Sequence, residues 1–339
     1  MPRDTSWMGS HWGLFVHYLA DTASAQAPVT LSAEAWNRRV DSFDVERFAA
    51  NAAELGAAWV GFTLGQNSGY FCSPNPVYDG LVARRPSRLS RRDLLGELAA
   101  ALSRRGVRTL AYLPSHAPAN DLEAVHALRC TPSWDCGQWS LGPQNLDPAA
   151  RAASDERLSV FQGHWQDIIA HWSKSWGEQV SAWWFDGCYY AERMYRHPQA
   201  PNFASFAAAA RSGNPAALVA MNGGVVVPVR PQEGSDEDYC AGELADHLPV
   251  PVNGDWSPSK PRALVDGRQR HFFTFLGPWW GVGPQPRFPD GMAAGWSSLA
   301  TASGAAVTWD IPVAHDGTIA EPIRRQLAAI REACRKRAP

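Results

Sequence analysis

The sequence predicts an α/β fold, a (β/α)8 TIM-like barrel in a single domain spanning residues 1–339. Short runs of apolar, β-branched and aromatic residues alternate with longer segments of helical period, which is typical of parallel strands joined by helices. Eight such runs occur, and eight is the strand number of this barrel. A chain of 339 residues can close one barrel, and it contains no sequence repeat and no linker that would divide it.

The eight expected strands follow one another along the chain. They are residues 12–19, 58–64, 107–113, 180–186, 217–222, 239–243, 271–276 and 306–311. Amphipathic helical period is clearest between them at 45–55 and 92–105 and after the last at 321–337. Gly56 and Gly106 stand where helix C-caps are expected. A two-domain protein with a doubly wound sheet is the alternative, but no glycine-rich phosphate loop follows the first strand.

The charge balance makes nucleic acid a poor partner. The 31 Lys and Arg residues against 33 Asp and Glu residues give a net charge of −2, with no broad basic field for phosphates. The first ten residues lack the apolar core of a signal peptide, and no stretch reaches the ~18 apolar residues of a membrane span. We therefore expect a cytoplasmic protein with no membrane partner. The 16 Trp residues weakly favour carbohydrate, since aromatic rings form platforms for sugar faces.

Cysteine spacing gives no sign of a metal site. The six cysteines are Cys72, Cys130, Cys136, Cys188, Cys240 and Cys334. They form no CxxC pair and have no histidine at ligand spacing, so we expect reduced thiols, no metal and no cofactor. A bridge between Cys130 and Cys136 is the alternative for an exported protein.

The catalytic and binding side chains of a barrel enzyme project from the carboxyl ends of its strands. Polar and aromatic residues there are therefore the first candidates for the functional site. These candidates are His17, Gln66, Asn67, His116, Asp186, Asn222, Glu243, Trp279, Trp280 and Asp310. Asp186 is the strongest, because it closes a run of large rings that includes Trp184, and Gly187 after it leaves space for a ligand. The alternative is that Asp186 only caps the following turn.

Glycoside hydrolysis by a carboxylate needs a second carboxyl group across the site. The acidic segment 233–243 offers several, of which Asp236, Glu237 and Asp238 are expected to lie in a solvated loop. Glu243 stands apart, because it follows a short β-like stretch and precedes an apolar one. It is therefore the expected partner of Asp186.

Several motifs, in order along most of the chain, resemble those of the α-L-fucosidase family of retaining glycoside hydrolases, glycoside hydrolase family 29. They are WGLFVH at 12–17, FDVERFAANAAELGAA at 43–58, WWFDG at 183–187, DYCAGE at 238–243, LGPWWG at 276–281 and AAVTWDIPVAHDGTI at 305–319. The resemblance implies that Asp186 is the nucleophile and Glu243 the acid/base of a double displacement. It also implies that the partner of this protein is a carbohydrate.

The sequence departs from the family's pattern where the sugar would bind. The family has a His-His pair after the second strand, whereas this chain has Gln66 and Asn67, which bind hydroxyls but carry no positive charge. Tyr18 replaces the Trp that follows the first strand's His, and the chain is expected to lack the family's C-terminal β-sandwich. These departures predict an altered pocket and a sugar that need not be fucose.

Two other functions remain open from the sequence. One is a catalytically silent barrel that binds a glycan or metabolite, because the His pair is absent. The other is a sugar isomerase or lyase that uses Asp186 and His17, although such enzymes usually hold a metal. If Glu243 is not the acid, Asp310 and Asp246 are the next candidates. The sugar, the linkage and the oligomeric state stay open.

Overall fold

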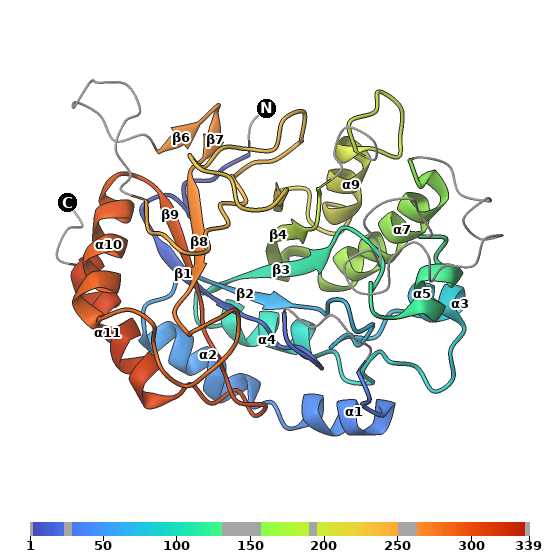
Figure 1. The fold of residues 1–339 in the computed structure, drawn as a ribbon, viewed down its shortest axis with the longest axis horizontal. Helices are drawn as coiled ribbons and strands as arrows, with labels where there is room; N and C mark the ends of the chain where they lie inside the picture. The colour runs from blue at the N-terminus through green and yellow to red at the C-terminus, as the bar shows by residue number, and fades with distance from the viewer. Residues whose placement is uncertain (1–2, 24–28, 131–156, 190–194, 250–262, 336–339) are drawn as a thin grey trace.

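The computed structural model describes residues 3–23, 29–130, 157–189, 195–249 and 263–335, and its centre is a curled sheet (Figure 1). Seven parallel strands form that sheet in the order β5-β4-β3-β2-β1-β9-β8. They are β1 (Trp12–Val16), β2 (Trp59–Thr63), β3 (Arg108–Pro114), β4 (Val180–Asp186), β5 (Leu218–Met221), β8 (His271–Phe275) and β9 (Ala306–Asp310). A separate antiparallel hairpin pairs β6 (Leu264–Val265) with β7 (Arg268–Gln269).

Helices cover the outside of this sheet, as Figure 1 shows. They are α1 (Ala33–Asp41), α2 (Val45–Glu54), α3 (Pro76–Val82), α4 (Leu94–Ser103), α5 (Leu122–Ala127), α7 (Ser159–Trp176), α9 (Phe203–Ala210), α10 (Asp290–Ala302) and α11 (Glu321–Arg335), and a 3-10 turn (Gly177–Gln179) leads into β4. Asp44 and Asp93 cap α2 and α4 by accepting from backbone N–H groups of the first turn. Gly56 and Gly106 adopt positive φ just after these two helices, at the positions predicted from the sequence.

Seven of the eight predicted strands are present, but the sixth, residues 239–243, is not a regular strand. It makes only isolated parallel bridges, Tyr239 with Gln269 and Glu243 with Phe273. The reason is that side chains take the place of a backbone ladder toward β5: the carboxylates of Glu237 and Asp238 accept from backbone N–H groups of that strand. Gly242, at φ 71°, also interrupts the extended backbone. The fold is therefore a curled, TIM-like parallel sheet of seven regular strands.

Side chains alternate between the two faces of each strand, and this alternation decides which of them reach the site. A cluster enclosed by the sheet collects residues from all seven strands, including Phe15, Tyr112, Trp184 and Phe273. Such a meeting of seven strands requires a curled sheet. Trp183, next to Trp184, points the other way and packs in the larger core that contains the helices. The register pairs Pro114 with Asp186, so neighbouring strands end at one edge.

Two sequence expectations about individual side chains are wrong. Glu237 does not lie in a solvated loop: it is buried, with 2% of its surface exposed. Cys130 is disulfide-bonded rather than a reduced thiol. Cys136 lies outside the described residues, whereas Cys72, Cys188, Cys240 and Cys334 are free. Disulfides are typical of oxidising compartments, whereas the sequence predicts a cytoplasmic protein. The location therefore stays a prediction.

Within the part of the chain that the structure describes, no helix combines the length and apolar character needed to cross a membrane. The same residues contain no group of three or more His, Cys, Asp or Glu side chains placed to hold a metal ion.

Candidate active site

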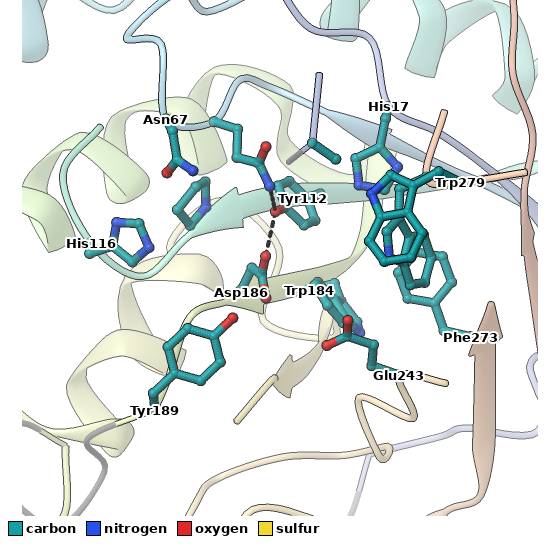
Figure 2. Close-up of a pocket in the computed structure, with 14 residues that line it drawn as sticks. His17, Asn67, Tyr112, His116, Trp184, Asp186, Tyr189, Glu243, Phe273 and Trp279 are labelled. Carbon is teal, nitrogen blue, oxygen red and sulfur yellow. Dashed lines mark hydrogen bonds between the residues drawn. The ribbon is translucent and has the colours of Figure 1, made fainter. Parts of the chain in front are cut away.

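A cavity of about 270 Å³ opens at the edge where the parallel strands end. Nine of the residues expected from the sequence line it (Figure 2): His17, Gln66, Asn67, His116, Trp184, Asp186, Glu243, Trp279 and Trp280. The curled sheet therefore brings together residues from positions 17 to 280 of the chain. Tyr112, Tyr189 and Phe273 also line the cavity and were missed by the sequence analysis.

Asp186, the last residue of β4, is held by three hydrogen-bond donors. Tyr112 donates its hydroxyl to Oδ2 at 2.6 Å, while Asn222 Nδ2 and the backbone N–H of Gly187 donate to Oδ1 at 2.8 and 2.9 Å. Donors aimed at a carboxylate stabilise its negative charge. Both oxygens are thereby fixed in orientation at the rim of the sheet.

Glu243 faces Asp186, and Asn222 bridges the two. The Nδ2 atom of Asn222 lies 2.8 Å from Oδ1 of Asp186 and 2.6 Å from Oε2 of Glu243, so these two oxygens are at most about 5.4 Å apart. Burial, and then the negative charge of Asp186, raise the pKa of Glu243 to about 7. The site therefore holds two neighbouring carboxyl groups of which one retains its proton up to near-neutral pH.

Tyr112 connects the nucleophile candidate to the second strand. It lies two residues before the end of β3, and its hydroxyl accepts a 2.8 Å bond from Gln66 Nε2 while donating to Asp186. Burial, together with the charge of Asp186, raises the pKa of Tyr112 well above its usual range, so the hydroxyl stays protonated. Side chains alternate between the two faces of β3, and Tyr112 occupies a position that faces the inside of the curled sheet. That alternation is the sequence signal that could have identified it.

Two acceptor atoms after the second strand are buried without a hydrogen-bond partner in the described structure. They are Oε1 of Gln66 and Oδ1 of Asn67. Buried polar atoms in native proteins normally have partners, so unpaired acceptors at a cavity wall are suited to donors on a ligand. A hydroxyl group of a sugar supplies such a donor.

His17 is oriented by Asp310, the last residue of β9. Its Nδ1 lies 2.7 Å from Oδ1 of Asp310, whose other oxygen accepts from the backbone N–H of Gly281 at 2.5 Å. Asp310 is completely buried and does not line the cavity, so it acts through His17 rather than by touching a ligand. Similarly, Asn222 reaches the site through its bonds to the two carboxylates.

His116 lies on the opposite side of the cavity, close to the backbone after Asp186. Its Nδ1 donates to the carbonyl oxygen of Ala117 at 2.8 Å, which fixes the ring. Gly187 adopts φ 75°, and a Cβ atom there would lie 2.7 Å from Cδ2 of His116. A glycine is therefore required both by the backbone conformation and by the approach of this ring.

Aromatic rings form much of the remaining wall. Trp184 is nearly buried, stacks on Tyr112 with a centroid separation of 5.4 Å, and donates from Nε1 to the carbonyl of Ala241. Trp280 packs on Phe273 at 4.9 Å and near His17 at 5.6 Å. Trp279, by contrast, is 40% exposed, which leaves its ring surface available at the mouth of the cavity.

Known protein families and curated proteins give no sequence match to this chain. Solved structures do share its fold. The endo-fucoidan hydrolase MfFcnA4 of glycoside hydrolase family 107 matches with a TM-score of 0.67 and 17% identity, over 96% of this chain and 52% of that one. This chain thus spans about half the length of that enzyme.

Two α-L-fucosidases are also similar in structure. Isoenzyme 1 from Paenibacillus thiaminolyticus has a TM-score of 0.61 at 15% identity, covering 96% of this chain and 73% of its own. AlfC from Lactobacillus casei, solved with α-L-fucose, has a TM-score of 0.61 at 14% identity, covering 98% and 97%. At these identities the fold is what is shared. The sequence motifs pointed to the α-L-fucosidases, whereas the structures include endo-fucoidan hydrolases as well.

Proposed function

We propose that this chain is a retaining glycoside hydrolase in which Asp186 is the nucleophile and Glu243 the acid/base. The observation that carries this proposal is the separation of their oxygens, at most about 5.4 Å across Asn222. Retaining enzymes hold their carboxyl groups about 5–5.5 Å apart, whereas inverting enzymes leave room for a water molecule between them.

In the first step, Oδ1 or Oδ2 of Asp186 attacks the anomeric carbon while Glu243 gives its proton to the departing glycosidic oxygen. A glycosyl ester forms and the leaving group departs as an alcohol. In the second step Glu243 removes a proton from water, which attacks the anomeric carbon and releases Asp186 as a carboxylate. The pKa of Glu243, near 7, suits a group that must be protonated first and then accept a proton.

The sugar we propose is α-L-fucose or one with a similar arrangement of hydroxyl groups. The fold shared with α-L-fucosidases and an endo-fucoidan hydrolase supports this choice. Gln66 and Asn67 would accept bonds from sugar hydroxyls through their unpartnered oxygens, and His17 would bind a third hydroxyl. Trp279 and Trp280 would stack on the apolar face of the ring.

Covalent trapping tests the proposal directly. A 2-deoxy-2-fluoro-α-L-fucosyl fluoride should label the protein once, and peptide mass spectrometry should locate the label on Asp186. The Asp186→Asn variant should take no label and should lose at least ~10⁴-fold in turnover of an aryl α-L-fucoside. Asp236→Asn, at an exposed carboxylate of the neighbouring loop, is the matched control and should be labelled like the wild type.

The acid/base role is tested separately with Glu243→Ala and added azide. Azide is a nucleophile that needs no deprotonation, so it should attack the glycosyl ester in place of water, release Asp186 as a carboxylate, restore turnover and yield a glycosyl azide of retained configuration. A panel of aryl glycosides of galactose, arabinose and glucose in both anomers decides the sugar. Sugar binding without label or turnover on any of them would favour a silent binding barrel instead.

A further inference from the structure

A second cavity of about 480 Å³ adjoins the candidate active site. Asn222 and Glu243 line it, and Glu243 also lines the first cavity, so this carboxyl group forms a wall common to both. The rest of its lining comes from residues of the segment 223–235 after β5, from Asp266 and Arg268 of the β6–β7 hairpin, and from Arg196, Met221, Ala241 and Gly242. The second cavity therefore lies on the acid/base side of the paired carboxylates.

The inference drawn from this position rests on the proposed function, in which Glu243 is the proton donor. The proton goes to the oxygen that joins the bound sugar to the leaving group. Asp186 belongs to the first cavity and not to the second, so the sugar that it attacks occupies the first. The leaving group starts at Glu243, and the second cavity is the space next to it.

The two cavities differ in the chemistry of their walls. Six aromatic side chains line the first, whereas the described lining of the second has no aromatic ring and three arginines, Arg196, Arg230 and Arg268. Glu233 and Asp266 are the carboxylates there besides Glu243. A wall of this kind does not stack on a sugar ring, but guanidinium groups bind carboxylates and sulfates through paired donors.

The arginines of the second cavity are not all neutralised by neighbours. Arg196 donates to the backbone carbonyl of Glu233 at 2.7 Å and lies 3.8 Å from its carboxylate. For Arg230 and Arg268, no ion pair occurs with any side chain in the described ranges. Arg268 is near enough to the buried Glu237 to act on its charge. Two guanidinium groups thus remain for an anionic ligand.

A buried carboxyl group fixes the wall that carries Arg230. Glu237 accepts from the backbone N–H groups of Met221 and Gln232 at 2.6 and 2.5 Å and from the hydroxyl of Ser235 at 2.9 Å. These bonds tie both ends of the segment after β5 to the end of that strand. The buried carboxyl group of Glu237 therefore fixes the two ends of the segment that lines the second cavity.

We propose that the second cavity is the leaving-group site and that it selects a leaving group bearing an anion, either a carboxylate or a sulfate ester. Arg230 and Arg268 bind that anion. Arg196 also lines the cavity and is held by the backbone carbonyl of Glu233. The first cavity, with its uncharged amides, binds the sugar that is transferred to Asp186.

Binding measurements test this without requiring turnover. D-galacturonate, D-galactose 6-sulfate and D-galactose are titrated calorimetrically into the wild-type protein at low ionic strength. One or both anionic sugars should bind roughly 10-fold or more tightly than galactose, because hydrogen bonds to a charged group are stronger than those between neutral groups. The stronger of the two identifies the anion as carboxylate or sulfate.

Variants then locate the site. Arg230→Gln with Arg268→Gln should abolish the preference for the anionic sugar, while Arg38→Gln, at an exposed position of α1, should preserve it. Free L-fucose should not compete with the anionic sugar. Equal affinities for the three probes, an unchanged preference in the double variant, or competition by L-fucose would each overturn the inference.

The outcomes separate this inference from the proposed function. If Asp186 is labelled but no anionic sugar is preferred, the second cavity has another role and the hydrolase assignment stands. If the anionic sugar binds through Arg230 and Arg268 but no label forms, the anion site stands and its role as a leaving-group site is refuted together with the hydrolase assignment.

Discussion

The hydroxyl group of Tyr112 donates a 2.6 Å hydrogen bond to Oδ2 of Asp186. This bond is strongest when Asp186 carries its full negative charge, which in the proposed mechanism it has before attack and regains when the glycosyl ester breaks. Tyr112 is therefore expected to assist the departure of the carboxylate in the second step more than the attack in the first. Tyr112 was not among the candidates taken from the sequence, yet it contacts the carboxylate of the proposed nucleophile.

Replacing Tyr112 with Phe is expected to slow hydrolysis of the glycosyl enzyme by roughly 10-fold or more, the value of one hydrogen bond to a charged group. The covalent intermediate should accumulate, and rapid-mixing experiments should show a burst of aryl alcohol followed by a slower steady state. Tyr78→Phe is the matched control, since the buried Tyr78 hydroxyl has no partner in the described structure. A Tyr112→Phe enzyme with no burst would contradict this role.

The pH dependence of kcat/KM should follow the proton on Glu243. Because burial and the charge of Asp186 raise its pKa to about 7, the acid is protonated below this pH and catalysis should decline as pH rises through it. In Glu243→Gln, assayed with an aryl glycoside that needs no protonation of its leaving group, the decline near pH 7 should be absent. Persistence of the same decline would assign it to another group.

Removing the amide of Asn222 should move that decline to higher pH. The bond from Asn222 stabilises ionised Glu243 and so lowers its pKa, and Asn222→Ala removes it along with the bond to Asp186. Turnover should also decrease, because both carboxylates lose a shared support. Asn214→Ala, a buried asparagine that donates to a backbone carbonyl of β4, should leave the pH profile unchanged. A profile that shifts downward in Asn222→Ala would refute the coupling.

Folding stability should report the same titration with a definite sign. The pKa of Glu243 is raised in the folded state. Its contribution to the free energy of unfolding is therefore fully present below the unfolded pKa of about 4.5 and is lost as pH rises through 7. Between pH 5 and pH 8 the free energy of unfolding of the wild type should fall by on the order of 3 kcal/mol more than that of Glu243→Gln. Urea unfolding of both proteins at the two pH values measures this. Parallel curves for the two proteins would contradict it.

Gly187→Ala tests the backbone after Asp186. Alanine at φ 75° is strained, and its Cβ would lie 2.7 Å from the ring of His116, so we expect a loss of roughly 1–3 kcal/mol and a large fall in turnover. Gly163→Ala on α7 is the control. Apart from its own helix backbone and chain neighbours, no atom of the described residues lies within 4 Å of a Cβ there, so that change should stabilise the helix by roughly 0.5–1 kcal/mol. Equal effects of the two substitutions would exclude the steric argument.

Most of the sheet could be predicted from the sequence because buried parallel strands are continuous apolar runs. The run at 180–186 coincides with β4, and the candidates at strand ends converge on one cavity because parallel strands end at the same edge. The segment 239–243 has the composition of a strand, but its neighbour's N–H groups bond to the carboxylates of Glu237 and Asp238. Composition does not reveal that side-chain carboxylates bond to these N–H groups in place of backbone carbonyls.

The roles of Asn222 and Asp310 were also beyond the sequence. Asn222 follows β5, Asp310 ends β9, and both were expected to contact a ligand, but hydrogen bonds direct one to the two carboxylates and the other to His17. Whether a polar residue at a strand end faces a ligand or supports another residue depends on distances between strands. Tyr112 was missed for the opposite reason, because a tyrosine inside an apolar run has the appearance of a core residue.

The two carboxyl groups of the candidate site lie in different kinds of backbone, Asp186 in the regular strand β4 and Glu243 in an irregular segment. Asp186, the proposed nucleophile, ends a strand paired on both sides, so changes to its surroundings act on the central sheet. Glu243, the proposed acid, lies in a stretch held mainly by isolated bridges and side chains. If the proposed function holds, sequence changes in that stretch would reshape the leaving-group side of the reaction while the strand that carries Asp186 stays intact, which would give this architecture a route to new linkages without refolding.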